Sequence, residues 1–164
     1  MRFTTRGHYG TRAMLELAMQ PTQRPVMLKT IAANQKLSAK YLEQILARLR
    51  EAGLVRVVRG RGGGFVLSRS PKEMTLLEIL RALEGEVAVF DCVTCPDICE
   101  RADHCVVRNV WCTLSDQMTQ FLASVGLDQL ARDAEAMQRK TASAKARSDR
   151  RQRSTATSRS KERR

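Results

Sequence analysis

The sequence predicts a mainly α-helical protein with a small β-wing, a winged helix-turn-helix, followed by a long dimerisation helix. Three observations support this fold class. Residues 28–51 have the pattern of a short helix, a tight turn and a longer helix. Residues 55–67 contain two short apolar runs on either side of a basic glycine-rich loop. After His104, apolar residues recur three or four positions apart, as on one face of a long helix.

The first helix is expected from Phe3 to Met19, with Thr4 or Thr5 as its cap. In the following pair of helices, Ser38 caps the longer one, which ends at Glu51. One face of that helix carries an apolar stripe formed by Leu42, Ile45, Leu46 and Leu49.

The opposite face of the longer helix is polar. A short helix, a turn and a longer helix with polar residues near its start is the layout of a helix-turn-helix, whose second helix enters the major groove of DNA. An ordinary helical hairpin with a solvated face fits this segment equally well. The polar residues are Lys40, Glu43, Gln44, Arg48 and Arg50.

The next segment favours DNA binding. The glycines of the loop at residues 59–64 let the backbone approach a duplex closely, and Arg59 or Arg61 can reach a narrow minor groove, where the negative potential is strongest. A phosphate-binding loop is the alternative, but the Lys-Ser/Thr ending of a P-loop is missing. The loop therefore predicts a wing.

Beyond the wing, Thr75 and Glu78 form a capping box that opens a helix ending at Leu83. A loop is expected up to Asp103, followed by the long helix and a short helix at residues 127–137. An apolar stripe of this kind is usually core, and on a long helix beside a small domain it is often a dimer seam. Its members are Trp111, Leu114, Met118, Phe121 and Leu122.

The charge is concentrated at the C-terminal end. The formal net charge is +12, and residues 138–164 hold eleven of the 29 Lys and Arg residues. This segment has no aromatic residue and no apolar period, so we expect a disordered basic tail. No apolar run approaches the roughly 20 residues that span a bilayer, and the N-terminus lacks the apolar core of a signal peptide. We therefore expect a cytoplasmic protein.

All five cysteines lie between residues 91 and 112. In a reducing compartment, clustered cysteines are more often metal ligands or redox thiols than a disulfide framework. Soft thiolates select zinc, copper(I) or iron-sulfur clusters. The spacing leaves an iron-sulfur cluster, a zinc site and thiol redox chemistry open, in that order. The cysteines are Cys92, Cys95, Cys99, Cys105 and Cys112.

Four segments together resemble the family of iron-sulfur winged-helix transcriptional regulators typified by IscR, NsrR and RirA. They are the opening MRFTTRGHYG, the helix SAKYLEQILARLREAGLV, the wing VRGRGGGFVL and the cysteine loop that ends in Trp111. The likeness extends to about Leu130. It implies a homodimeric regulator that holds an iron-sulfur cluster and binds a palindromic operator in double-stranded DNA. It also implies Arg59 in the minor groove, and in the major groove Ser38, Lys40, Tyr41, Glu43 and Gln44.

The resemblance implies cluster ligands at Cys92, Cys99 and Cys105. This chain departs from the IscR pattern in two ways: six residues separate Cys92 from Cys99 where IscR has five, and Arg108 stands where IscR has a histidine ligand. A guanidinium stays protonated and is a poor ligand. The fourth ligand is therefore open, with Cys95 preferred over His8 of the other subunit, and Cys112 expected to be a buried free thiol. Such a site favours a four-iron over a two-iron cluster.

These observations predict a cluster-sensing regulator of transcription. The domains would be a DNA-binding domain at residues 1–85, a cysteine loop with a dimerisation helix at 86–137, and the tail at 138–164. A DNA-binding protein with a structural zinc site is the alternative. No acid-base pair or nucleophile triad accompanies the cysteines, so we do not expect an enzyme.

Overall fold

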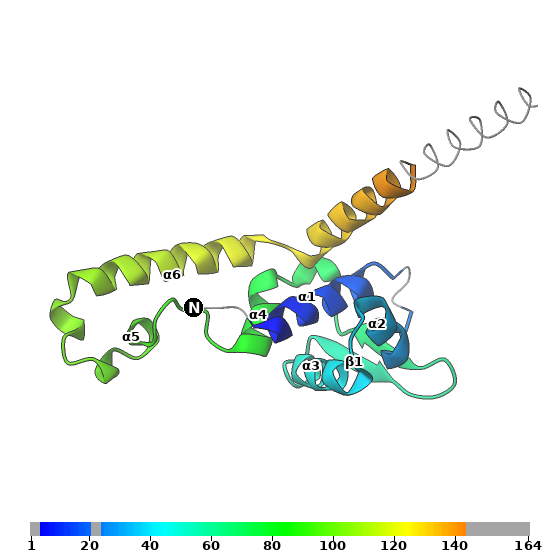
Figure 1. The fold of residues 1–164 in the computed structure, drawn as a ribbon, viewed down its shortest axis with the longest axis horizontal. Helices are drawn as coiled ribbons and strands as arrows, with labels where there is room; N and C mark the ends of the chain where they lie inside the picture. Colours follow the sequence, from blue (N-terminus) through cyan, green and yellow to red (C-terminus); the bar gives the residue numbers. More distant parts are fainter. Residues whose placement is uncertain (1–3, 21–23, 144–164) are drawn as a thin grey trace, which may run out of the picture. The chain divides into compact units, whose positions relative to one another are not determined.

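The computed structural model describes residues 4–20 and 24–143 (Figure 1). The chain divides into two units, residues 1–131 and 132–164. The elements from α1 to α6 all belong to the first unit. They are α1 (Thr5–Ala18), α2 (Leu28–Gln35), α3 (Ala39–Glu51), β1 (Val55–Val58), β2 (Gly64–Leu67), the 3-10 turn η2 (Pro71–Glu73), α4 (Leu76–Glu84), α5 (Asp91–Thr94), the 3-10 turns η3 (Pro96–Ile98) and η4 (Ala102–His104), and α6 (Val106–Ser124).

Helices α2 and α3 form the predicted helix-turn-helix. Lys36 ends α2 in the left-handed conformation, with φ of 55°, and this turns the chain sharply into α3. Ser38 caps α3 by accepting a hydrogen bond from the backbone N–H of Tyr41. The predicted apolar stripe is fully buried: Leu42, Ile45, Leu46 and Leu49 are each 0% exposed.

Strands β1 and β2 form the predicted wing. They pair antiparallel, with Val55 opposite Leu67 and Val58 opposite Gly64. The turn between them depends on glycine because Gly60 and Gly62 have φ values of 98° and 79°, which other residues rarely adopt. A small wing on a mainly helical body confirms the predicted fold class.

The core of this body is one apolar cluster, to which α1, α2, α3, both strands and α4 contribute. Helix α1 approaches α4 very closely at Gly10, where an added Cβ would lie 2.2 Å from a methyl carbon of Leu83. Helix α4 starts at the predicted capping box, in which the Thr75 hydroxyl and the Glu78 carboxylate each accept a bond from the other's backbone. The close approach at Gly10 packs the middle of α1 against the last turn of α4.

The cysteine segment is less irregular than the loop that we expected, because α5, η3 and η4 each form a single turn. Pro96 starts η3, as proline often does in a first helical turn. The long helix α6 follows as predicted. Among the residues that the structure describes, no helix is both long and apolar enough to cross a membrane.

A last helix begins at Leu127 and continues through residue 143, further than the end at Met137 that we expected. Residues 138–143 are therefore helical rather than disordered. Arg139 pairs with Glu135 one turn earlier at 3.0 Å, an arrangement that supports a helix. The rest of the expected tail lies outside the described residues.

Candidate DNA-binding face and cysteine loop

The residues predicted to contact the major groove lie on one side of α3, opposite the buried stripe. The Ser38 hydroxyl oxygen is committed to the helix cap, where it accepts the bond from Tyr41 at 3.2 Å. The other side chains are exposed, except that Tyr41 is half-buried. The structure thus gathers on one accessible face Ser38, Lys40, Tyr41, Glu43 and Gln44.

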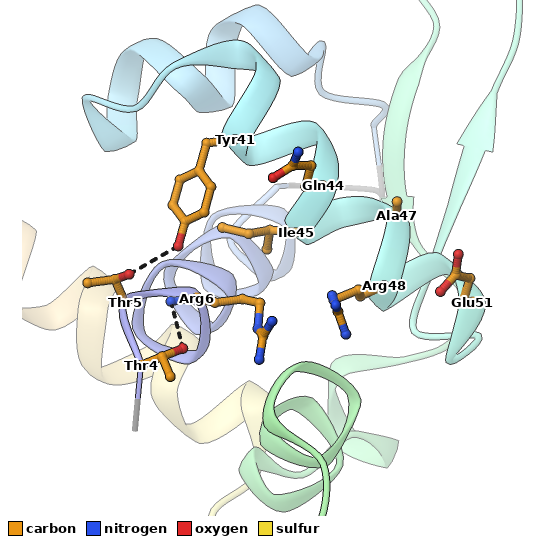
Figure 2. Close-up of a pocket in the computed structure, with 9 residues that line it drawn as sticks. All are labelled: Thr4, Thr5, Arg6, Tyr41, Gln44, Ile45, Ala47, Arg48 and Glu51. Atoms are coloured by element: carbon orange, nitrogen blue, oxygen red, sulfur yellow. Dashed lines mark hydrogen bonds between the residues drawn. The ribbon is translucent and has the colours of Figure 1, made fainter. Parts of the chain in front are cut away.

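Two contacts hold the side chain of Tyr41 in place. Its hydroxyl shares a hydrogen bond of 3.1 Å with the Thr5 hydroxyl at the start of α1 (Figure 2). Its ring meets the ring of Tyr9 edge-on, with centroids 6.5 Å apart and planes at 86°. Helix α1 therefore orients one of the predicted DNA-contacting residues. Sequence reasoning missed this link, because nothing in the pattern of α1 indicates which hydroxyl faces α3.

An open notch of about 740 Å³ lies between the start of α1 and the middle of α3. The side chains of Arg6 and Arg48 extend into the space between the two helices (Figure 2). Arg6 pairs with Glu84 at 3.6 Å, whereas Arg48 has no side-chain partner among the described residues. The notch thus adds an unpaired cation beside the face of α3.

The two wing arginines, Arg59 and Arg61, are both exposed at the turn between β1 and β2. Neither side chain has a hydrogen bond or ion pair within the part of the chain that the structure describes. The wing therefore presents two free guanidinium groups close to its glycine turn.

Glu84, the last residue of α4, caps α1 from outside. Its Oε1 accepts hydrogen bonds from the Thr4 hydroxyl at 2.6 Å, the Gly7 N–H at 2.7 Å and the Thr4 N–H at 3.3 Å. Burial acts to raise the pKa of this carboxyl, but the bonds from Thr4 and Gly7 and the charge of Arg6 together outweigh it, and the pKa is lowered. The carboxylate is thus held ionised at the N-terminal end of α1, where negative charge is favoured.

The five cysteines are free thiols on the segment from α5 to α6. Cys92 lies in α5, Cys95 ends that helix and is exposed, and Cys99 follows η3. Cys105 caps α6 through its sulfur, which accepts a bond of 3.4 Å from the Arg108 N–H. Cys112 is half-buried within α6 rather than fully buried.

The structure does not bring these thiols together into a formed site. Within the described residues, no three Cys, His, Asp or Glu side chains converge as metal ligands do. His8 is exposed on α1, where its ring meets that of Tyr9 with centroids 5.2 Å apart. The ligand set predicted from the sequence is therefore present on one short segment but not assembled.

One face of α6 holds the chain that leads into the cysteine loop. Ser115 accepts a hydrogen bond of 3.1 Å from the backbone of Val89, and Trp111 packs on Phe90 with ring centroids 5.0 Å apart. One turn further toward the start of the helix, the Arg108 Nε donates to the Cys92 carbonyl oxygen at 2.8 Å. Nearer the end of α6, Leu122 and Met118 pack with Val87, Leu77 and Leu80.

A second face of α6 remains uncovered. The predicted stripe is therefore split: Trp111, Met118 and Leu122 face inward, whereas Leu114 and Phe121 face outward. The outward residues repeat at helical spacing, and single exposed apolar residues are common but an aligned row is not. The exposed row consists of Val107, Val110, Leu114 and Phe121.

The chemistry of the cysteine loop fits a soft metal centre. Four thiols lie between residues 92 and 105, and thiolates are the ligands of iron-sulfur clusters and of structural zinc. The donor set fits either centre.

Comparison with known proteins places these features in context. The model of the Rrf2 family, described as an iron-dependent transcriptional regulator, matches residues 3–133. The HTH-type transcriptional regulator IscR of Photorhabdus laumondii is 37% identical over 137 residues, which cover 84% of this chain and 83% of that protein. Among solved structures, T. potens IscR is 39% identical with a TM-score of 0.69, covering 84% of this chain and 91% of that one. CymR, the global cysteine regulator of B. subtilis, is 36% identical with a TM-score of 0.67, covering 80% and 97%.

Proposed function

The chain belongs to the Rrf2 family of transcriptional regulators, and from that premise we propose that it is a DNA-binding regulator that senses iron-sulfur cluster status. A regulator acts by binding rather than by turnover, so the chain is not an enzyme, as the sequence predicted. The observation that carries the proposal is the coexistence, in one unit, of an exposed winged helix-turn-helix and a segment with four thiols. Such a protein would act in the cytoplasm, where it reaches DNA.

The DNA-binding part of the proposal rests on the accessible face of α3 and on the wing. Lys40, Glu43 and Gln44 are exposed, and their polar groups have no side-chain partner among the residues that the structure describes, so they can read base edges in the major groove. Arg59, with Arg61 beside it, would enter the minor groove. Arg48 in the notch adds a cation suited to a backbone phosphate.

A test of this part begins with a binding site selected from random duplex DNA. Arg59→Ala should lower affinity for that site about tenfold and relax the base preference at the minor-groove position. Arg101→Ala, which removes an exposed arginine of the cysteine segment, is the control. An even loss of affinity across all sequences would instead assign Arg59 to a phosphate.

The partner subunit would be a second copy joined through the exposed row of α6. Two copies related by a twofold axis would present two copies of α3 to a palindromic operator. Val110→Glu places a charge in the middle of the row and should convert a dimer to a monomer in sedimentation, whereas Asn109→Glu on the neighbouring exposed position should not. A monomeric wild-type protein would refute this interface.

The cluster would be held by Cys92, Cys99 and Cys105, with Cys95 as the fourth ligand and a four-iron cluster preferred. Cys95 is exposed, whereas the other four cysteines are half-buried, so its thiol is accessible to a metal centre. His8 of the partner subunit and Cys112 are the remaining candidates for the fourth position. When bound, the cluster would supply a centre that iron supply, oxidants or nitric oxide can build or destroy.

The deciding experiment is anaerobic purification followed by iron, sulfide and zinc analysis and DNA binding of the loaded and metal-free forms. About four iron and four sulfide per subunit would support the four-iron cluster, and about two of each the two-iron form. Different operator affinities of the two forms would support sensing. Zinc without sulfide, or equal affinities, would overturn the sensing part and leave the DNA-binding part intact.

A further inference from the structure

Arg108 connects the two ends of the cysteine segment. Its side-chain Nε donates to the Cys92 carbonyl oxygen at 2.8 Å, although the two residues are 16 positions apart. Its backbone N–H donates to the Cys105 carbonyl oxygen at 3.0 Å and is shared with the Cys105 sulfur at 3.4 Å. One residue on the first turn of α6 therefore contacts the first and the last of the proposed ligand residues.

The hydrogen bond from the Arg108 Nε to the Cys92 carbonyl oxygen belongs to a series of contacts along one face of α6. The residues at positions 108, 111 and 115 of the helix hold positions 92, 90 and 89 of the incoming chain. Each contact lies one turn from the next, and the chain runs antiparallel to the helix. Cys92 lies in α5, and η3 follows it in the chain, so the Arg108 bond joins α6 to the start of the cysteine segment.

The helix itself does not favour an arginine at this position. A cation in the first turn opposes the helix dipole, and α6 has no acidic residue there to offset it. Within the described part of the chain, no carboxylate pairs with Arg108. The hydrogen bond to Cys92 is therefore the interaction that accounts for the placement of this side chain.

We propose that Arg108 is a positioning residue that fixes the Cys92 backbone against the start of α6, the helix that Cys105 caps, so that Cys92 and Cys105 can converge on one centre. The proposal deepens the proposed function by assigning a role to a residue that is not a ligand. Groups that hydrogen-bond to ligand residues orient them, and their removal commonly weakens metal binding 10- to 100-fold. The bond joins two groups of the protein itself, so it can be tested in the metal-free protein.

Two substitutions separate the hydrogen bond from the charge. Arg108→Gln places the Nε2 donor at the same distance along the side chain as the arginine Nε and removes the positive charge. Arg108→Met gives a side chain as long as that of glutamine and removes the hydrogen-bond donor as well as the charge. Arg101→Met, in an exposed arginine of the same segment with no side-chain partner among the described residues, is the matched control.

The first measurement is amide hydrogen exchange of residues 91–95 in the metal-free, reduced full-length protein. The Val93 and Cys95 amides donate to the carbonyl oxygens of Phe90 and Asp91 in the turn of α5. Loss of the Arg108 hydrogen bond in Arg108→Met should speed the exchange of these two amides about fivefold. Arg108→Gln should stay within about twofold of the wild type, and Arg101→Met should not change. Equal exchange in Arg108→Met and wild type, or equal acceleration in the Gln and Met variants, would overturn the proposal.

The second measurement is anaerobic titration with Co²⁺ alone, followed by its thiolate charge-transfer absorption. Arg108→Met should bind Co²⁺ about tenfold more weakly than the wild type, with Arg108→Gln close to the wild type. Wild-type protein that binds no Co²⁺ through thiolates would count against the proposed centre, while the exchange result would still decide whether Arg108 holds Cys92. Unchanged Co²⁺ affinity in Arg108→Met would overturn the positioning role.

Discussion

Removal of the Glu84 carboxylate should measurably loosen the attachment of α1 to α4. All three hydrogen bonds that Glu84 accepts from the start of α1 reach one oxygen, Oε1, and the second oxygen faces Arg6 at 3.6 Å. Glu84→Met keeps a side chain of similar length and removes every acceptor. Glu84→Gln keeps an oxygen for the three donors and removes the charge.

The magnitude follows from what each donor does after the change. The exposed Thr4 groups can bond to water, whereas the Gly7 N–H is buried and would lose its partner, at a cost of about 1–3 kcal/mol. With the lost charged bond to Thr4, we expect Glu84→Met to lower the free energy of unfolding by about 2–4 kcal/mol. Bonds to a charged acceptor are roughly twice as strong as neutral ones, so Glu84→Gln should lose only about 1–2 kcal/mol.

Urea unfolding followed by helical circular dichroism measures both losses. The pKa of Glu84 is lowered from its ordinary value of 4.5, because the bonds and the charge of Arg6 outweigh burial. Its stabilisation is therefore complete above the unfolded value near 4.5 and is lost as pH falls through the lower folded value. The difference between wild type and Glu84→Gln should be constant at neutral pH and shrink in acid. A Glu84→Met loss below about 1 kcal/mol, or a Gln variant as damaged as Met, would refute the capping role.

Three further outcomes follow from local geometry. Gly10→Ala should lower the free energy of unfolding by about 1–3 kcal/mol, because the added Cβ meets Leu83 at 2.2 Å; a higher urea midpoint would contradict this close packing. Lys36→Gly should raise it by about 0.5–1 kcal/mol by relieving the left-handed conformation, and Lys36→Ala, which keeps the Cβ, should not. Thr5→Val removes the bond to Tyr41 and should weaken binding to a selected DNA site up to about fivefold with an unchanged salt dependence; an altered salt dependence would point to a phosphate contact instead.

The DNA-binding half was predictable because its decisive signals are local. The Ser38 cap and the Thr75 capping box act within one helical turn, and the wing turn needs the positive φ that glycine supplies. None of these depends on distant parts of the chain. The contact between Thr5 and Tyr41 does, since it requires α1 to cross α3 at one particular angle, and a periodic pattern contains no crossing angle.

The stripe on α6 shows the limit of periodicity more directly. Four residues of this stripe recur at helical spacing. Trp111 and Met118 nevertheless face inward, whereas Leu114 and Phe121 face outward. The difference arises because residues 87–92 and helix α4 together cover one face of α6. Spacing identifies an amphipathic helix, but the segment that covers each face is set by tertiary structure.

The cysteine loop combines both cases. Its spacing indicated a soft metal centre, and the predicted ligands do lie on one short segment, but their convergence depends on the backbone path through α5, η3 and η4. Arg108 is a poor metal ligand because a guanidinium stays protonated. That same property makes it a permanent donor, and the acceptor is a carbonyl oxygen 16 residues away. The arginine that stands where IscR has a histidine thus supplies a donor to the backbone of Cys92, a predicted ligand residue.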